Sequence, residues 1–177
     1  MTIEYKSFET DRLLLIPTTV EDAAFQLELM NSALWIQNIG DRGVKTLEAC
    51  EKYILNRMIA QEERLGFSNY TVFIKPQRIP IGSCGLYDRE GIEGIDIGFA
   101  FMPEYFGKGY AYEAASTIMQ AGIELFGLSK INAITIRDNI TSQKLLDKLG
   151  LKYIRDIRLP NDDADLLYYE YKVTELD

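Results

Sequence analysis

The sequence contains no histidine and only two cysteines, and these absences exclude several classes of active site. Ser-His-Asp and Cys-His catalysis both need an imidazole, and zinc sites are built chiefly from cysteine and histidine. Cys50 and Cys84 do not form a C-x-x-C pair, so we expect two buried thiols and no metal site. Any acid or base must therefore come from Asp, Glu, Tyr, Lys, Ser, the α-amino group or water.

Cationic side chains and long apolar runs are also scarce. The 19 Lys and Arg residues are outnumbered by 27 Asp and Glu residues, which gives a net charge of −8 at pH 7. A nucleic acid must be met by clustered cations, so we expect no nucleic-acid partner and favour a cationic one. No apolar run approaches the length of a membrane span, and Met1–Tyr5 lacks the basic start of an export signal. The sequence therefore predicts a cytoplasmic protein with no membrane partner.

Hydrophobic periodicity and turn residues predict one domain over residues 1–177. The expected elements, in chain order, are a strand at 13–17, helices at 20–31 and 46–64, strands at 70–74, 79–87 and 95–102, a helix at 110–126, a strand at 130–136, a helix at 141–149, and strands at 151–159 and 165–173. The helix at 110–126 joins two parallel strands as a β-α-β unit. An α/β (α+β) fold follows, with a mixed, mostly antiparallel seven-stranded sheet, a central parallel β-α-β unit and flanking helices.

The stretch from Phe106 to Ala111 joins a strand to a strong helix through Gly107, Lys108 and Gly109. Glycines let the backbone approach an anion closely, and the first N–H groups of a helix point into the same space. With Lys108 nearby, these amides would hold a pyrophosphate without a metal ion. The alternative is an ordinary helix entry with a flexible turn. The glycine spacing excludes both the nucleotide P-loop and the dinucleotide fingerprint.

Two segments give the chain a family resemblance. The first is Phe106-Gly107-Lys108-Gly109-Tyr110-Ala111 followed by Glu113, and the second is Asn139-Ile140-Thr141-Ser142 followed by Leu145-Leu146 and Lys148-Leu149-Gly150-Leu151. With these motifs and this order of elements, the chain resembles the GNAT superfamily of N-acetyltransferases over almost its whole length. Within that superfamily it is similar to the branch of ribosomal-protein N-terminal (alanine) acetyltransferase-like enzymes, the RimJ/RimL type.

The resemblance implies acetyl-CoA as cosubstrate and no metal ion. It places the cofactor contacts on three parts of the chain. These are Phe101 and Met102 at the strand end for the pantetheine arm, Phe106, Gly107, Lys108, Gly109, Tyr110 and Ala111 for the pyrophosphate, and Asn139 and Ser142 for the acetyl end. For Asn139 the alternative is a cap for the helix that begins near Thr141.

The resemblance also implies two catalytic residues. Ser142 would protonate the leaving thiolate, because Leu146 stands where many members carry a tyrosine acid; a small residue chosen for packing is the alternative. Asp96 matches an acidic position common in the branch and would accept the amine proton, or else form a salt bridge on the solvated face. Glu104 replaces the Gln or Arg that often begins the family loop, so phosphate binding depends on the backbone amides.

The resemblance implies an N-acetyltransferase that moves acetyl to a primary amine by direct attack in a ternary complex. The acceptor would be a protein N-terminus or a small cationic amine, bound by the segment from Asn31 to Gly43 and the last hairpin. A non-catalytic acyl-CoA-binding sensor or interaction module is the alternative. A third reading, a ping-pong enzyme using Cys84, lacks a histidine to activate the thiol.

Two local features, Gly98 and a group of tyrosines, each allow two structural interpretations, and Trp35 allows one. Gly98, inside a strand, indicates either a β-bulge or a ligand pressed against the backbone. Tyr168, Tyr169 and Tyr171 would suit either a surface for a homodimer or the core. Trp35 is expected in a loop between the first two helices.

Overall fold

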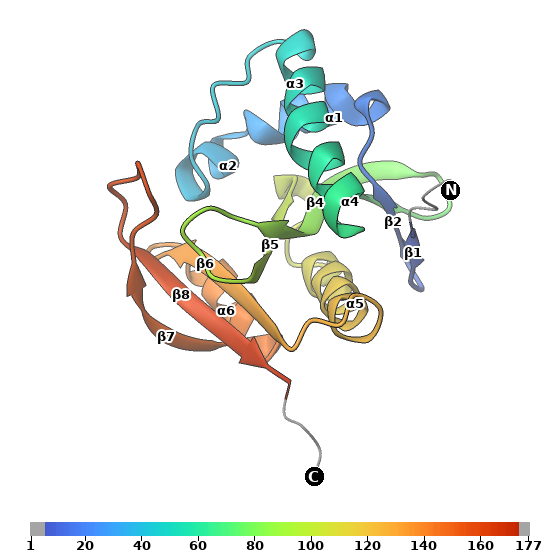
Figure 1. Cartoon of the computed structure of the whole chain (residues 1–177). Helices are drawn as coiled ribbons and strands as arrows, with labels where there is room; N and C mark the ends of the chain where they lie inside the picture. The colour runs from blue at the N-terminus through green and yellow to red at the C-terminus, as the bar shows by residue number, and fades with distance from the viewer. Residues whose placement is uncertain (1–5, 174–177) are drawn as a thin grey trace.

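An eight-stranded sheet carries the fold, with its strands in the order β1-β2-β3-β4-β5-β6-β8-β7 (Figure 1). The computed structural model describes residues 6–173, so the predicted absence of an export signal at Met1–Tyr5 lies outside the described residues. The strands are β1 Phe8–Glu9, β2 Leu13–Pro17, β3 Asn69–Ile74, β4 Ile79–Asp88, β5 Ile95–Phe101, β6 Lys130–Ile136, β7 Lys152–Ile157 and β8 Leu166–Lys172. Neighbours are antiparallel except β5 and β6, which are parallel. The predicted fold class is confirmed.

The strand count differs by one from the predicted seven. The additional strand is β1, which has two residues and pairs with β2 through Phe8 opposite Leu15. Two residues are too few to show an alternating pattern, so this strand is visible only through its pairing. It extends one edge of the sheet and leaves the predicted topology intact.

The helices are η1 Val20–Asp22, α1 Ala23–Met30, α2 Ala33–Asn38, α3 Leu47–Tyr53, η2 Ile54–Ile59, α4 Ala60–Leu65, η3 Pro103–Tyr105, α5 Tyr110–Glu124 and α6 Ile140–Lys148. The predicted helix at 46–64 is present as α3, the π-helical η2 and α4. Trp35 was predicted in a loop but lies in α2, because Ser32 caps that short helix by accepting from the Trp35 N–H at 3.3 Å. Within residues 6–173, no helix is long and apolar enough to cross a bilayer.

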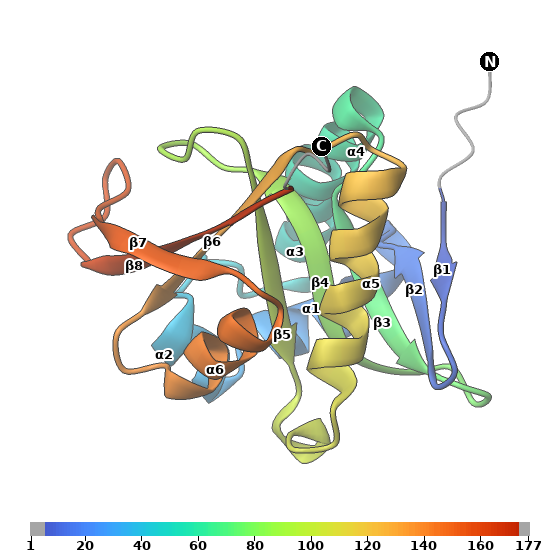
Figure 2. The same ribbon diagram turned by 90° about the horizontal axis from the view of Figure 1, so that it is seen from below.

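Helices cover both faces of the sheet, with α5 and α6 on one face and α1 to α4 on the other (Figures 1 and 2). Small residues let α5 lie close to the strands, since Ala114 and Ala115 are fully buried and a Cβ at Gly122 would lie 3.1 Å from Leu86. On the other face, buried Gln26 ties α1 to the sheet by donating to Ser83 Oγ at 2.9 Å. These contacts fix the frame on which the site is built.

The sheet opens between β5 and β6, its two parallel strands. Their ladder has a single residue pair, Asp96 opposite Asn132, whereas β4 and β5 pair from Gly82 with Phe101 to Asp88 with Ile95. Beyond Asp96 the two strands separate toward their carboxyl ends (Figure 2). The edge of β5 that faces β6 therefore keeps unpaired backbone groups beside the start of α5.

Gly98 was predicted to mark either a β-bulge or a bound ligand. In the structure the aromatic ring of Tyr87 packs against it and leaves little room for a side chain. Gly98 lies opposite Gly85 in the ladder of β4 and β5, and the Tyr87 side chain lies across this pair. A Cβ at Gly98 would lie 2.9 Å from Tyr87 Cε2, and one at Gly85 would lie 2.4 Å from the Ser68 carbonyl oxygen. The ladder has no register shift at Gly98, so neither predicted explanation is needed here.

We expect the two glycines to respond differently to substitution by alanine. Gly85→Ala forces a Cβ against a backbone oxygen and should lower the free energy of unfolding by about 1–3 kcal/mol, as overpacking does. Gly98→Ala meets only the edge of a side chain and should cost less. Chemical denaturation of both variants, alone and with Tyr87→Leu, checks this: the second substitution should relieve Gly98→Ala and should not relieve Gly85→Ala.

A buried carboxyl on α4 predicts a dependence of stability on pH. Glu62 is 5% exposed, and burial, with the neighbouring Glu63 charge, raises its pKa from 4.5 to about 7. Because the folded-state pKa is the higher one, this contribution to stability is present below pH 4.5 and is lost as pH rises to about 7. Glu62→Gln should therefore raise the free energy of unfolding at pH 8 by on the order of 2 kcal/mol. Urea denaturation should show no such gain at pH 4.

Candidate active site

Two glycines with left-handed backbone shape the loop between β5 and α5. Gly107 has φ of 73° and Gly109 has φ of 82°, a region that non-glycine residues rarely adopt. Gly109 is the residue from which α5 begins. Between them, the Lys108 ammonium lies 5.5 Å from the ring centroid of Tyr105. The loop therefore turns sharply and brings its backbone to the amino end of α5.

The backbone N–H groups from Gly107 to Ala111 form a cluster without acceptors. Within the described residues, none of them donates to a backbone or side-chain oxygen. Phe106 is an exception among the predicted loop contacts, because its N–H donates to the Pro103 carbonyl at 3.1 Å. Free amides at the start of a helix attract an anion through their partial positive charge. This geometry fits a pyrophosphate.

An arginine from the edge of the sheet reaches this loop. Arg12, next to β2, forms an ion pair with Glu113 of α5, with Nη2 and Oε2 2.6 Å apart, and its Cζ lies 4.5 Å from the Tyr110 ring centroid. Burial raises the pKa of Glu113, but hydrogen bonds from Thr10 and Arg12 outweigh burial, and the pKa lies below its usual value. Sequence reasoning missed Arg12, since the two partners are 101 residues apart and no local pattern links them.

The carboxyl end of β5 borders the same loop. Phe101 is buried in the main core, and the Met102 N–H donates to the Ile81 carbonyl at 2.9 Å. The Met102 N–H is therefore already used, and the open edge of β5 facing β6 offers the free backbone groups. An extended molecule with amide groups can pair with such an edge as an added strand does.

The first turn of α6 holds the second predicted motif. Asn139 is the N-cap residue, and its Oδ1 accepts from the Ser142 N–H at 3.1 Å, so the predicted cap is present. The Asn139 side-chain amide nitrogen has no acceptor within residues 6–173. Ser142 is half-buried, and its hydroxyl makes no hydrogen bond with the described chain. Both groups are therefore free to contact a ligand.

Asp96 is buried, not on a solvated face as its salt-bridge alternative assumed. It is 1% exposed, and the Arg89 guanidinium lies 3.2 Å from its carboxylate oxygens. Burial raises the pKa of Asp96, and the Arg89 charge opposes that rise. Both oxygens are engaged, so the geometry favours the salt bridge over the proton acceptor. Arg89 lies across the β4–β5 hairpin from Asp96, and the strand pattern would have indicated this pair.

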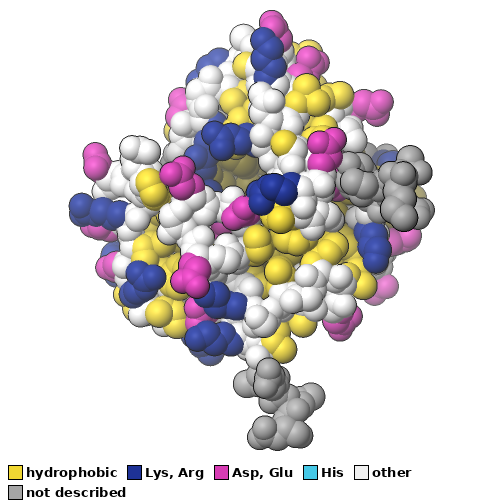
Figure 3. All heavy atoms as spheres, in the orientation of Figure 1, with side chains coloured by type: hydrophobic (Ala, Val, Ile, Leu, Met, Phe, Trp, Pro, Cys, Tyr) yellow, Lys and Arg dark blue, Asp and Glu magenta, His cyan; other side chains and the backbone are white. Residues whose placement is uncertain are grey.

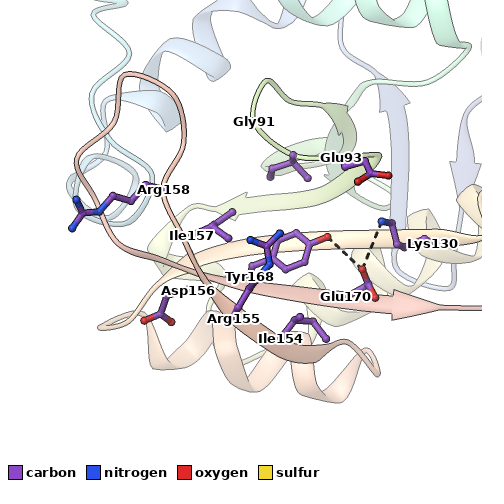
Figure 4. A pocket seen from close by; sticks show the side chains of 11 residues that line it. Gly91, Glu93, Lys130, Ile154, Arg155, Asp156, Ile157, Arg158, Tyr168 and Glu170 are labelled. Carbon is purple, nitrogen blue, oxygen red and sulfur yellow. Dashed lines mark hydrogen bonds and ion pairs between the residues drawn. The ribbon is translucent and has the colours of Figure 1, made fainter.

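A polar pocket of about 500 Å³ lies on the face opposite α6 (Figure 4). Tyr168, which lines the pocket, links it to the point where β5 and β6 separate, because its hydroxyl donates to Asn132 Oδ1 at 2.7 Å. A Cβ at Gly91 would lie 2.4 Å from Pro160 Cδ, so the β4–β5 loop touches the β7–β8 loop above the pocket. The charged residues that line it are Glu93, Lys130, Arg155, Asp156, Arg158 and Glu170.

This pocket contains part of the predicted acceptor wall, the last hairpin. The other part, the segment from Asn31 to Gly43, includes α2, which borders a hollow at the centre of the same face, with Lys and Arg side chains on its rim (Figure 3). Tyr168 and Tyr169 are 6% and 4% exposed, and Tyr171 is partly buried against the main core, so these side chains follow the predicted core alternative. Across residues 6–173, no three His, Cys, Asp or Glu side chains lie close enough together to hold a metal ion.

Comparison with known proteins agrees with this geometry. The family model described as "Acetyltransferase (GNAT) domain" matches residues 12–152, most of the chain. The chain belongs to the GNAT acetyltransferase family. The matched region contains the β5–α5 loop, the opening between β5 and β6, and the first turn of α6.

Relatives and solved structures place the chain among GNAT proteins. It is 30% identical over 110 residues to "Uncharacterized N-acetyltransferase YnaD" of Bacillus subtilis, an alignment that spans 57% of this chain and 65% of YnaD. It is 26% identical over 145 residues to "Uncharacterized N-acetyltransferase YoaA" of the same organism, with 81% of each chain covered. RimL, a ribosomal L7/L12 alpha-N-protein acetyltransferase solved with coenzyme A, shares the fold with a TM-score of 0.81 at 18% identity, over 95% of this chain and 98% of that one.

Substitution of a loop glycine provides a test of the anion site. Gly109→Val places a β-branched side chain where φ is 82° and should weaken coenzyme A binding at least about tenfold, because the free amides lose their arrangement. Gly127→Val is the matched control, since Gly127 follows the other end of α5, has φ of 68° and has open space around its Cβ. Calorimetry should show normal affinity for the control. Equal affinity for both folded variants would contradict the assignment.

Proposed function

We propose that this GNAT protein transfers acetyl from acetyl-CoA to a primary amine by direct attack in a ternary complex. The supporting observation is the row of acceptor-free N–H groups from Gly107 to Ala111, which ends beside the opening between β5 and β6. An anion site next to an open strand edge matches a molecule that carries a pyrophosphate at one end and amide groups along an arm. RimL, whose fold is shared, was solved with coenzyme A.

Each part of acetyl-CoA has a proposed set of contacts. The amides from Gly107 to Ala111 and Lys108 hold the pyrophosphate, and the open β5 edge up to Phe101 holds the pantetheine arm. Met102, which was also predicted to contact this arm, has its backbone N–H and carbonyl bonded to Ile81 and Tyr105. Asn139 and Ser142 lie at the start of α6, across the opening from β5, and contact the acetyl end. No metal ion takes part in this arrangement, because the amides supply the positive potential that a phosphate needs.

In the proposed reaction the amine nitrogen attacks the thioester carbonyl and the carbon–sulfur bond breaks. The Ser142 hydroxyl, which has no partner within the described chain, donates its proton to the departing thiolate and regains one from water. Holding the two reactants in line provides most of the rate, since well-oriented reactants gain about 7–11 kcal/mol. Backbone N–H groups of β5 are placed to stabilise the developing oxyanion.

Water, not Asp96, accepts the amine proton in this proposal. Arg89 engages both carboxylate oxygens of Asp96, and the side chain is 1% exposed, so the amine cannot approach it without breaking the ion pair. Asp96 instead lies at the single position where β5 and β6 pair, opposite Asn132.

For the acceptor we propose a peptide N-terminus, as in the ribosomal-protein branch, bound in the pocket under the β4–β5 loop. The pocket carries three carboxylates and three cations, so its charges balance. A polyamine would be favoured by an excess of carboxylates, whereas a peptide backbone with mixed side chains needs both signs. An acyl-CoA sensor without turnover remains the second candidate, because the anion site alone would serve it equally well.

A thiol-release assay separates these candidates. Purified protein with acetyl-CoA should release coenzyme A thiol faster when peptides that imitate ribosomal-protein N-termini are added, and spermidine should give a smaller increase. The same peptides with acetylated N-termini are the matched control and should give none. Tight binding of acetyl-CoA without thiol release on any amine would support the sensor and contradict the transferase.

The role of Ser142 predicts a separation of kinetic constants. Ser142→Ala should lower kcat by about 10–100-fold and leave the affinity for acetyl-CoA nearly unchanged, because its proposed role is late protonation and water can substitute. Thr141→Ala is the matched control, since Thr141 is an exposed neighbour in the same turn. Steady-state kinetics would contradict the role if kcat stayed at the wild-type value while KM for acetyl-CoA rose.

A further inference from the structure

The segment that forms the proposed pyrophosphate site carries negative charge, which disfavours binding of a phosphate. Glu104 stands at the start of the loop and Glu113 in the first turn of α5, and between them Lys108 is the single cation. The Lys108 ammonium lies over the Tyr105 ring. Two carboxylates near the amino end of a helix compete with a phosphate for the same positive potential. Glu113, which lies in the helix itself, needs a further cation to offset its charge.

Arg12 provides that cation from a different part of the chain. Its Nε donates to Glu113 Oε2 at 2.7 Å, its Nη2 lies 2.6 Å from the same oxygen, and its backbone N–H donates to Glu113 Oε1 at 3.2 Å. Its Nη1 donates to the Lys108 carbonyl at 2.9 Å. One guanidinium thus contacts both the loop and the first turn of α5.

The sheet holds Arg12 in place. The Arg12 carbonyl accepts from the Lys75 N–H at 2.9 Å, and the Leu13 N–H donates to Thr10 Oγ1 at 2.9 Å. The Thr10 hydroxyl also donates to Glu113 Oε1 at 2.5 Å, which completes the enclosure of that carboxylate. Since β2 and β3 pair along their full length, this platform is rigid.

We propose that Arg12 is a positioning residue of the cofactor loop: it neutralises Glu113 and holds the Lys108 carbonyl, so that the free amides face the pyrophosphate. The proposal rests on the proposed function, because it concerns the same site. It explains how the amino end of α5 can bind an anion although Glu113 stands in its first turn. A bidentate guanidinium is needed, since an ammonium cannot contact Glu113 and Lys108 in the same geometry.

A set of four variants tests the proposal by calorimetry with coenzyme A at fixed ionic strength. Arg12→Gln leaves an unpaired carboxylate beside the phosphates and should weaken binding by about tenfold or more. Glu113→Gln alone should bind coenzyme A at least as well as the wild type. Arg12→Gln with Glu113→Gln should recover a large part of the lost affinity. Arg64→Gln, which removes a surface arginine paired with Asp88 at 2.8 Å, is the control and should change nothing.

If the double variant recovers affinity for coenzyme A, the loss in Arg12→Gln comes from the unpaired Glu113 charge and not from loss of structure. If Arg12→Gln binds like the wild type, or if Glu113→Gln restores none of the loss, the proposal is wrong. Arg12→Lys serves if Arg12→Gln does not fold by circular dichroism, and it should also bind more weakly, because it retains charge without the bidentate contact.

A second measurement is independent of the ligand. NMR titration of the Glu113 carboxyl should show its pKa rising toward the usual value in Arg12→Gln, and an unchanged pKa would overturn the proposal. If the wild type fails to bind coenzyme A while this pKa responds, the proposed function fails and the coupling of Arg12 to Glu113 stands.

Discussion

Two parallel strands that pair at one position and then separate leave polar backbone groups that need partners. In this protein the opening begins at Asp96 and Asn132 and widens toward the start of α5. Antiparallel neighbours on both sides keep β5 and β6 in place, since β4 and β8 pair with them along their length. The opening is thus a stable part of the fold, and the β5–α5 loop and the first turn of α6 both lie at its edges.

The Asp96–Arg89 pair and Tyr87 support the closed end of this opening. A guanidinium that engages both oxygens stabilises the buried carboxylate, and removing Arg89 would leave a buried, unpaired charge. Arg89 Cζ lies 5.8 Å from the Tyr87 ring centroid, and that ring covers Gly85 and Gly98. A residue that resembles a catalytic base in the sequence thus belongs to a layer of polar and aromatic packing in the structure.

The sequence predicts the features that depend on a few consecutive residues, but not those that depend on very short elements or on contacts between distant residues. The order of strands and helices followed from periodicity, and the loop at Gly107 and Gly109 followed from their spacing, because both are properties of a few consecutive residues. The strand β1 and the helix α2 were missed because each is too short for a period to appear. Arg12 was missed because its link to Glu113 depends on how β2 and α5 pack, and no residue next to it in sequence indicates that.

The contact between Gly91 and Pro160 lies away from the glycine loop. It joins the β4–β5 loop to the β7–β8 loop over the polar pocket, while the glycine loop and α6 lie on the other side of the sheet. Changes in the length or composition of these two surface loops would alter what enters the pocket without touching the anion site. Loops tolerate such changes better than strands do. Under the proposed function, a lineage could therefore exchange one amine for another and keep its acyl donor, and the Gly91–Pro160 contact is where the pocket entrance would widen or narrow.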